Sequence, residues 1–119
     1  MSESILRLKS YAFALKVIHV YKQIIAEHKE YVLSKQFLKA GTSIGALVRE
    51  AEFAQSKPDF ISKLSISLKE ANETDYWILL LRDSNYITFE TANELLANDK
   101  ELISMLVASI KTAKQSLGK

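Results

Sequence analysis

Residues 41–77 read GTSIGALVREAEFAQSKPDFISKLSISLKEANETDYW, and this stretch decides the fold. Apolar and small residues recur along it at steps of three and four, the spacing of a helix that buries one face. The segment Ser56-Lys57-Pro58-Asp59 interrupts that spacing. Proline fits the first turn of a helix, and the helix dipole favours an acid there. The stretch therefore predicts two helices joined by a short turn.

The same spacing extends outward over the rest of the chain and predicts helices over about 3–28, 34–55, 58–83 and 88–117. Thr88 is a good N-cap for the last of these. Short connections between consecutive helices make them antiparallel neighbours. We therefore predict an all-α fold, a single antiparallel up-down-up-down four-helix bundle over residues 1–119.

Seven-residue spacing assigns the residues that face the core. For the second helix they are Leu33, Phe37, Ala40, Ile44, Leu47, Ala51 and Ala54. For the fourth they are Ala92, Leu96, Ile103, Leu106, Ile110, Ala113 and Leu117, with Asp99 interrupting the row. Gly41 and Gly45 lie four apart beside the second row. Because glycine costs a helix about 1 kcal/mol relative to alanine, the pair indicates close approach of another helix.

Composition limits the class of protein. The chain has 119 residues, 48% of them hydrophobic, and no cysteine, which excludes disulfides and thiolate metal sites. Its longest purely apolar run is Trp77–Leu81, far below the ~20 residues that span a bilayer. The N-terminal residues show no apolar signal segment. We expect a cytoplasmic protein without a membrane partner, and its net charge of +2 leaves a polyanionic partner open.

No catalytic, cofactor or metal residues are predicted. Gly41-Thr42-Ser43-Ile44-Gly45 matches the G-x-S-x-G nucleophile elbow, but it lies in a helical pattern, and both histidines precede Ser43. A di-iron bundle needs Glu-x-x-His pairs, which this chain lacks. Glu70 and Glu73 are one turn apart beside Trp77. They are either an acid–base pair or, as we favour, partners of a base such as Arg49 or Lys63.

Two further apolar rows lie outside the predicted core rows. On the third helix this row contains Ile66, Glu70, Glu73, Trp77 and Leu80, and on the first it contains Leu8, Tyr11, Leu15, Ile18 and Ile25. Either the core is broad enough to bury both rows, or they mark an interface. We favour self-association, with the row on the third helix as the candidate interface.

Basic residues spread over the first two helices. The candidates for nucleic-acid contact are Lys9, Lys16, Lys35, Lys39 and Arg49. In a ring, a modest patch repeats by symmetry and becomes a continuous surface that attracts phosphates. An ordinary solvated face is the alternative, because lysine is usually exposed.

An ordered set of short motifs points to one family. They are Gly41-Thr-Ser-Ile-Gly-Ala, Glu50-Ala51, Ala54-Gln-Ser, Asp59-Phe60-Ile61, Lys63-Leu64, Leu68-Lys-Glu-Ala, Glu73-Thr74 and Tyr76-Trp77. Together they resemble the bacterial four-helix-bundle proteins of the 23S rRNA intervening-sequence family. The chain departs from the family pattern at Leu47, where asparagine is usual.

The resemblance implies a compact bundle that assembles into rings, commonly homopentamers. Some relatives are encoded inside insertions in 23S rRNA genes. A related branch resembles the accessory proteins of diversity-generating retroelements, which bind nucleic acid and a reverse transcriptase. No enzymatic activity is attached to the family. We therefore expect a non-enzymatic accessory that binds RNA or DNA. The alternative is a protein–protein interaction scaffold with a protein partner and no nucleic-acid role.

Overall fold

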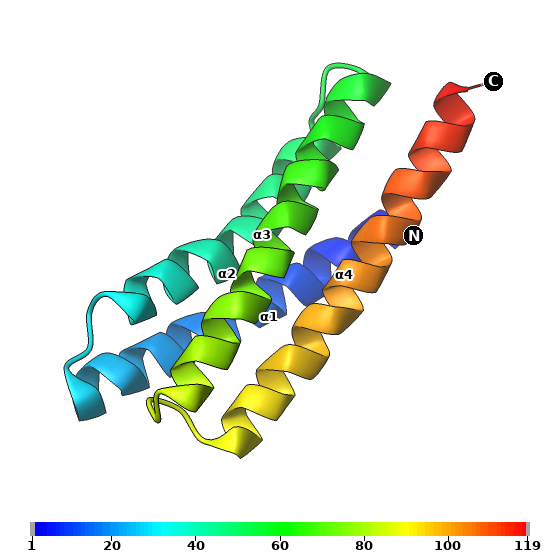
Figure 1. The fold of residues 1–119 in the computed structure, drawn as a ribbon. Coiled ribbons are helices and arrows are strands. Elements are labelled where there is room, and N and C mark those ends of the chain that lie inside the picture. Colours follow the sequence, from blue (N-terminus) through cyan, green and yellow to red (C-terminus); the bar gives the residue numbers. More distant parts are fainter. Residues whose placement is uncertain (1, 119) are drawn as a thin grey trace.

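The computed structural model describes residues 2–118, with side chains described for residues 5–118. The four helices are α1 (Ser2–His28), α2 (Leu33–Glu52), α3 (Lys57–Asp83) and α4 (Phe89–Leu117). They form a rod with extents of 52 × 21 × 20 Å (Figure 1). Across residues 2–118, no helix combines the length and the apolar character that crossing a membrane requires.

The helices follow one another around the bundle. Each packs against the next in sequence, and α1 and α4 close the circuit with the smallest of the four contacts. Consecutive helices run in opposite directions (Figure 1). The diagonal pairs, α1 with α3 and α2 with α4, have no close backbone contact within the described residues. The predicted all-α four-helix bundle is confirmed, and these contacts are those of an up-down-up-down arrangement.

Hydroxyl caps begin the two later helices, and that of Thr88 was predicted. The hydroxyl of Ser56 accepts the backbone N–H of Asp59 at 3.2 Å, and Pro58 lies in the first turn of α3. The hydroxyl of Thr88 accepts the N–H of Thr91 at 3.0 Å and caps α4. Both caps satisfy N–H groups that have no partner inside the helix.

The cap of α2 was not predicted. The carboxylate of Glu30 accepts the backbone N–H groups of Val32, Leu33 and Ser34 at 2.8–2.9 Å. Burial raises the pKa of Glu30, but the N–H donors of Leu33, Ser34 and Val32 together outweigh it, and the pKa is lowered. The preceding residue, Lys29, has φ 51° and turns the chain out of α1. Glu30 therefore stabilises the α1–α2 connection more as an anion than as a neutral carboxyl group.

Helix ends show one difference from the prediction. α2 ends at Glu52 rather than at residue 55, because the N–H groups of Phe53 and Ala54 bond three residues back, to Glu50 and Ala51. This tightened last turn leaves residues 53–56 as the link to α3.

The C-terminal end of α3 is closed by a left-handed residue. Asn85 adopts φ 68°, and the N–H of Tyr86 donates to the carbonyl of Leu81 at 2.9 Å. Asparagine, like glycine, adopts this left-handed backbone conformation at the ends of helices.

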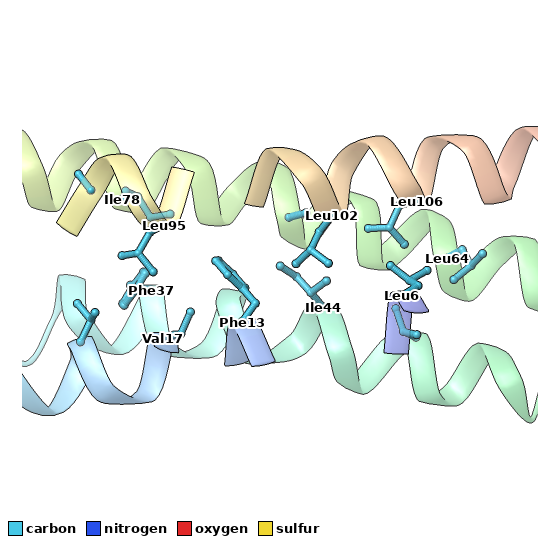
Figure 2. Packing of buried hydrophobic residues seen from close by; sticks show 14 of the residues in the cluster. Leu6, Phe13, Val17, Phe37, Ile44, Leu64, Ile78, Leu95, Leu102 and Leu106 are labelled. Atoms are coloured by element: carbon cyan, nitrogen blue, oxygen red, sulfur yellow. The ribbon is translucent and has the colours of Figure 1, made fainter. Parts of the chain in front are cut away.

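One apolar core runs along the whole bundle. Figure 2 shows Phe13 and Val17 of α1, Phe37 and Ile44 of α2, Leu64 and Ile78 of α3, and Leu95, Leu102 and Leu106 of α4 meeting along the axis. The core rows predicted for α2 and α4 need correction. Val48 is buried where Leu47 was expected, and Leu47 is only half-buried.

The correction in α4 has a clear cause. Leu95, Asp99 and Leu102 are buried, whereas Leu96 and Ile103, predicted to face inward, are only half-buried, and Leu117 is exposed. From Ala92 and from Asp99 the predicted row continued four positions on, to Leu96 and Ile103, whereas the helix buries the residues three positions on, Leu95 and Leu102. The structure places the carboxyl of Asp99 inside.

α1 and α2 approach each other closely at Gly41 and Gly45. A Cβ atom added at Gly41 would lie 2.7 Å from Cγ2 of Val17, which is fully buried. At Gly45 an added Cβ would lie 3.3 Å from the carbonyl oxygen of Ser10. Real side chains do not reach the first distance without displacement of a neighbour. The glycine at position 41 is therefore a steric requirement of this contact.

Candidate nucleic-acid and subunit interfaces

Three of the five basic candidates lie on α2. Lys35, Lys39 and Arg49 are exposed, and none forms an ion pair within residues 5–118. The 14 steps from Lys35 to Arg49 rise ~21 Å along the helix. They therefore form a row of unneutralised cations, here called the α2 basic row.

The other two candidates lie elsewhere and are neutralised. Nζ of Lys9 is 2.9 Å from Oε2 of Glu101. Nζ of Lys16 is 3.5 Å from Oε1 of Glu94 and donates to Oδ1 of Asn98 at 2.8 Å. Both lysines reach from α1 to α4, so they strengthen that boundary. The structure does not join Lys9 and Lys16 to the α2 basic row.

A shallow groove of about 290 Å³ lies beside the α2 basic row, between α1 and α2. Its lining includes the small residues Ala14, Gly45 and Ala46 together with the larger Arg7, Tyr11 and Arg49. Nη1 of Arg7 is 3.5 Å from Glu52, whereas Arg49 has no ion pair within residues 5–118. Sequence reasoning found no aromatic ring beside the basic residues. Tyr11 was assigned only to an apolar row, because its neighbours across the helix pair depend on the packing at Gly45.

The predicted interface row on α3 is partly used inside the protomer. Trp77 is half-buried and packs against the core, and its Nε1 donates to Oε2 of Glu73 at 3.1 Å. Its ring meets that of Tyr76 edge to face, with centroids 5.1 Å apart. Ile66 is exposed, and Glu70 and Leu80 are half-buried. Ile66 in this row and Tyr76 beside the row are both exposed, so this face of α3 presents apolar surface to solvent.

Lys63 is not the partner of the α3 carboxylates. Its Nζ lies 3.6 Å from Oε1 of Glu50 on α2. Within residues 5–118, neither Glu70 nor Glu73 pairs with a cation. The α3 edge, defined as Ile66, Glu70, Glu73, Tyr76, Trp77 and Leu80, is therefore both apolar and acidic.

The second row of α1 is the more exposed apolar surface. Leu8, Tyr11 and Leu15 are 67%, 56% and 52% exposed. They lie opposite Leu6, Phe13 and Val17, which point into the core. Three large apolar side chains on one outer helix face form a contiguous surface, here called the α1 outer face. Surfaces of this kind mark interaction sites.

The motifs that resemble catalytic or metal sites have structural roles here. Ser43 lies within α2, and its hydroxyl donates to the carbonyl of Lys39 at 2.7 Å, one turn back. The strand and strained turn that a nucleophile elbow needs are replaced by a regular helix. Over the described residues, no three His, Asp or Glu side chains gather closely enough to hold a metal ion.

Comparison with known proteins places the chain in a family. Residues 3–108 match the family model described as "23S rRNA-intervening sequence protein". A crystal structure of a protein of unknown function from the S23 ribosomal protein family of Bacteroides thetaiotaomicron is 48% identical, with a TM-score of 0.92. That similarity covers 93% of this chain and 99% of the other. A search of curated proteins found no match. The chain belongs to the 23S rRNA-intervening sequence protein family.

Proposed function

We propose that this protein is a non-enzymatic cytoplasmic accessory that assembles into a ring and binds the phosphate backbone of RNA or DNA. The observation that carries the proposal is the α2 basic row. Lys35, Lys39 and Arg49 leave three positive charges unneutralised on one helix. The distribution of charge along the chain supports the proposal. Residues 1–56 contain eight Lys or Arg and five Asp or Glu, whereas residues 57–119 contain eight Lys or Arg and nine Asp or Glu, so the positive charge lies in the first half.

Phosphate contacts give affinity without reading sequence. A row of lysines and one arginine suits this role, because each cation that neutralises a phosphate releases a bound counterion. In a ring the row is repeated in every protomer, and the repeats together offer a surface that a long polyanion follows.

A salt series tests the nucleic-acid role. Binding of the purified protein to a labelled structured RNA is measured by anisotropy from 50 to 300 mM salt. We expect a complex whose affinity falls linearly in a log–log plot, with a slope that counts the phosphates contacted. Absence of binding at 50 mM salt would contradict the role and leave the α2 basic row as solvated surface.

The ring rests on two different apolar surfaces of the protomer. The α1 outer face is rimmed by the cations Arg7 and Lys22, and the α3 edge carries Glu70 and Glu73 without a cation partner in the described residues. We propose that the α1 outer face of one copy packs against the α3 edge of the next. Contacts between unlike surfaces generate rings when the rotation closes. The family resemblance leads us to propose five copies.

Sedimentation of matched variants tests the assembly. Leu8→Glu with Leu15→Glu places two charges on the α1 outer face, and Ala97→Glu with Ser104→Glu places two at the same spacing on exposed positions of α4. We expect the wild type and the α4 pair to sediment at about five times the 13.5 kDa protomer, and the α1 pair as the protomer. A wild type that sediments at 13.5 kDa would contradict the ring.

A protein-interaction scaffold without a nucleic-acid role is the second candidate function. The exposure of Leu8, Tyr11 and Leu15 favours it, because the same face suits another protein. It requires one stoichiometric protein partner that persists after nuclease treatment, is lost with the α1 pair of substitutions and is retained with the α4 pair. A protein that binds RNA in the salt series and loses no partner with the α1 pair would exclude it.

A further inference from the structure

A carboxyl group lies in the middle of the apolar core. The side chain of Asp99 is 0% exposed, and neither carboxyl oxygen has a hydrogen-bond partner within the described residues. Leu95 and Leu102, one turn before and after it on α4, point into the core among the other helices (Figure 2). Other buried polar side chains, such as Ser67, donate to a carbonyl, in this case that of Ile44 at 2.9 Å. Asp99 is the exception.

The charges around Asp99 do not compensate its burial. From α3, Asp75 acts on it as a like charge. From α1, Lys9 and Lys16 reach α4 but are held by Glu101, Glu94 and Asn98. On α4 itself Lys100 and Glu101 point to solvent, and α2 contributes only apolar or hydroxyl side chains to the buried core. Burial, followed by the charge of Asp75, raises the pKa of Asp99 to about 8.

α4 has open surface along its C-terminal half. Its contact with α1 is the smallest in the bundle. Along its C-terminal half, a groove of about 590 Å³ separates it from the end of α2 and the start of α3. A second groove of about 330 Å³ lies on its other side, along Leu68 and Val107. Fewer packed neighbours make a helix the first to open.

We infer that Asp99 makes the docking of α4 sensitive to pH, so that α4 stays packed on α3 while the carboxyl is protonated and loosens when it ionises. An ionised carboxylate without partners in the core is costly, and the reaction that relieves this cost is exposure of Asp99 to water. The inference concerns regulation of the bundle and goes beyond the proposed nucleic-acid role.

The direction of the effect follows from proton linkage. In water an aspartate has a pKa of about 3.9. Docked α4 therefore binds one more proton than undocked α4 at every pH between about 4 and 8. In that window, undocking becomes about tenfold more favourable for each unit of rising pH. Below pH about 4 and above pH about 8 both states carry the same proton number, and the docking equilibrium becomes independent of Asp99.

Hydrogen exchange of the full-length protein tests this inference. An undocked helix frays in water, so its amides exchange. Exchange rates, divided by the intrinsic rates at each pH, are measured for peptides of α4 and of α2 at pH 5.5 and 7.5. We expect the protection of α4 amides around Asp99 to fall about 100-fold between these pH values. We expect the protection of α2 to change much less.

Three variants make the result specific. Asp99→Asn, which does not ionise, should remove the pH dependence in α4, and Glu90→Gln, at an exposed carboxyl on the same helix, should leave it unchanged. If Asp99→Asn does not fold, Asp75→Asn serves instead. Removing its charge should end the pH-dependent window below pH 8. An equal loss of protection in α2 and α4, or an identical profile in wild type and Asp99→Asn, would overturn the inference. With Asp75→Asn in its place, protection of α4 that keeps falling up to pH 8 as it does in the wild type would do the same.

Discussion

The α1–α2 hairpin and the α3–α4 hairpin each contain a carboxyl group with a structural effect, but the surroundings of these two groups are opposite. Between α1 and α2, the carboxylate of Glu30 accepts three backbone N–H groups at the surface. On α4, the carboxyl of Asp99 is buried and has no partner within residues 5–118. The packing also differs, because α1 and α2 meet closely at Gly41 beside a groove of about 290 Å³, whereas grooves of about 590 and 330 Å³ flank α4. We therefore propose that the α1–α2 hairpin supports the surface charge and that α4 is the part of the bundle most easily opened.

The two acids also link stability to pH with opposite signs. The pKa of Glu30 is lowered on folding, so its contribution is present above its unfolded pKa of about 4.3 and is lost as the pH falls. The pKa of Asp99 is raised to about 8, so its folded form loses stability as the pH rises from about 4 to 8. Stability against pH should therefore have a maximum in the acidic range rather than at neutral pH.

The largest effect on the α1–α2 hairpin is expected from Gly41→Val. The added side chain meets the stiff, buried Val17, and such overpacking typically costs about 3 kcal/mol. Urea unfolding of the single variants and of the double variant with Val17→Ala measures it. The double variant should regain more than 1 kcal/mol of that loss.

The matched control is Gly45→Ala. Its Cβ lies 3.3 Å from the nearest atom, and the gain in helix propensity of about 1 kcal/mol offsets the tighter contact. Its free energy of unfolding should stay within about 1 kcal/mol of the wild type. A Gly41→Val protein as stable as the wild type would show that the α1–α2 contact is not close, and the comparison of the hairpins would fail.

On the α3–α4 hairpin, Trp77→Ala tests whether this side chain matters more for assembly than for the stability of the protomer. Because Trp77 is half-buried, the protomer should lose about 2 kcal/mol of stability, less than for a fully buried tryptophan. Assembly should suffer more, since the α3 edge loses its largest apolar side chain. Sedimentation and urea unfolding of the same sample separate the two effects. A variant of unchanged mass that loses several kcal/mol of stability would make Trp77 a core residue only.

The smallest effect on stability is expected from Glu30→Ala. Loss of a helix cap typically costs about 1 kcal/mol. The difference from the wild type should be present at pH 7 and should shrink at pH 3, where Glu30 no longer accepts hydrogen bonds as an anion. Thermal unfolding at the two pH values measures it. A difference that grows as the pH falls would reverse the role assigned to this carboxylate.

Local chemistry made much of the fold predictable. Ser56, Pro58 and Thr88 carry their helix-starting preferences in their own side chains, so the starts of α3 and α4 were placed within one residue. Glu30 was missed because a glutamate two residues before the first N–H it binds is an unusual cap. The core row of α4 was misplaced on either side of Asp99, at Leu96 and Ile103, because apolar residues at steps of both three and four follow Ala92 and Asp99 and spacing alone does not choose between them.

The interfaces were less predictable, because they depend on which helices become neighbours. Lys9 and Lys39 look alike in the sequence, but only Lys9 faces an acid, Glu101, 92 positions away. The same is true of Tyr11, whose place beside Arg49 depends on α1 and α2 approaching at Gly45. Sequence spacing gives the face of one helix, and the partner across it comes from tertiary packing.

The central claim is that the α2 basic row binds phosphates, and two matched triple variants test it most directly. Lys35→Gln, Lys39→Gln and Arg49→Gln remove the row. Lys69→Gln, Lys111→Gln and Lys114→Gln remove the same charge from exposed positions on the α3–α4 hairpin. We predict that the first triple reduces the log–log salt slope of RNA binding by about 2 to 3, and that the second leaves the slope unchanged. An equal reduction of the salt slope in both triple variants would show that net charge, and not the α2 basic row, attracts the nucleic acid.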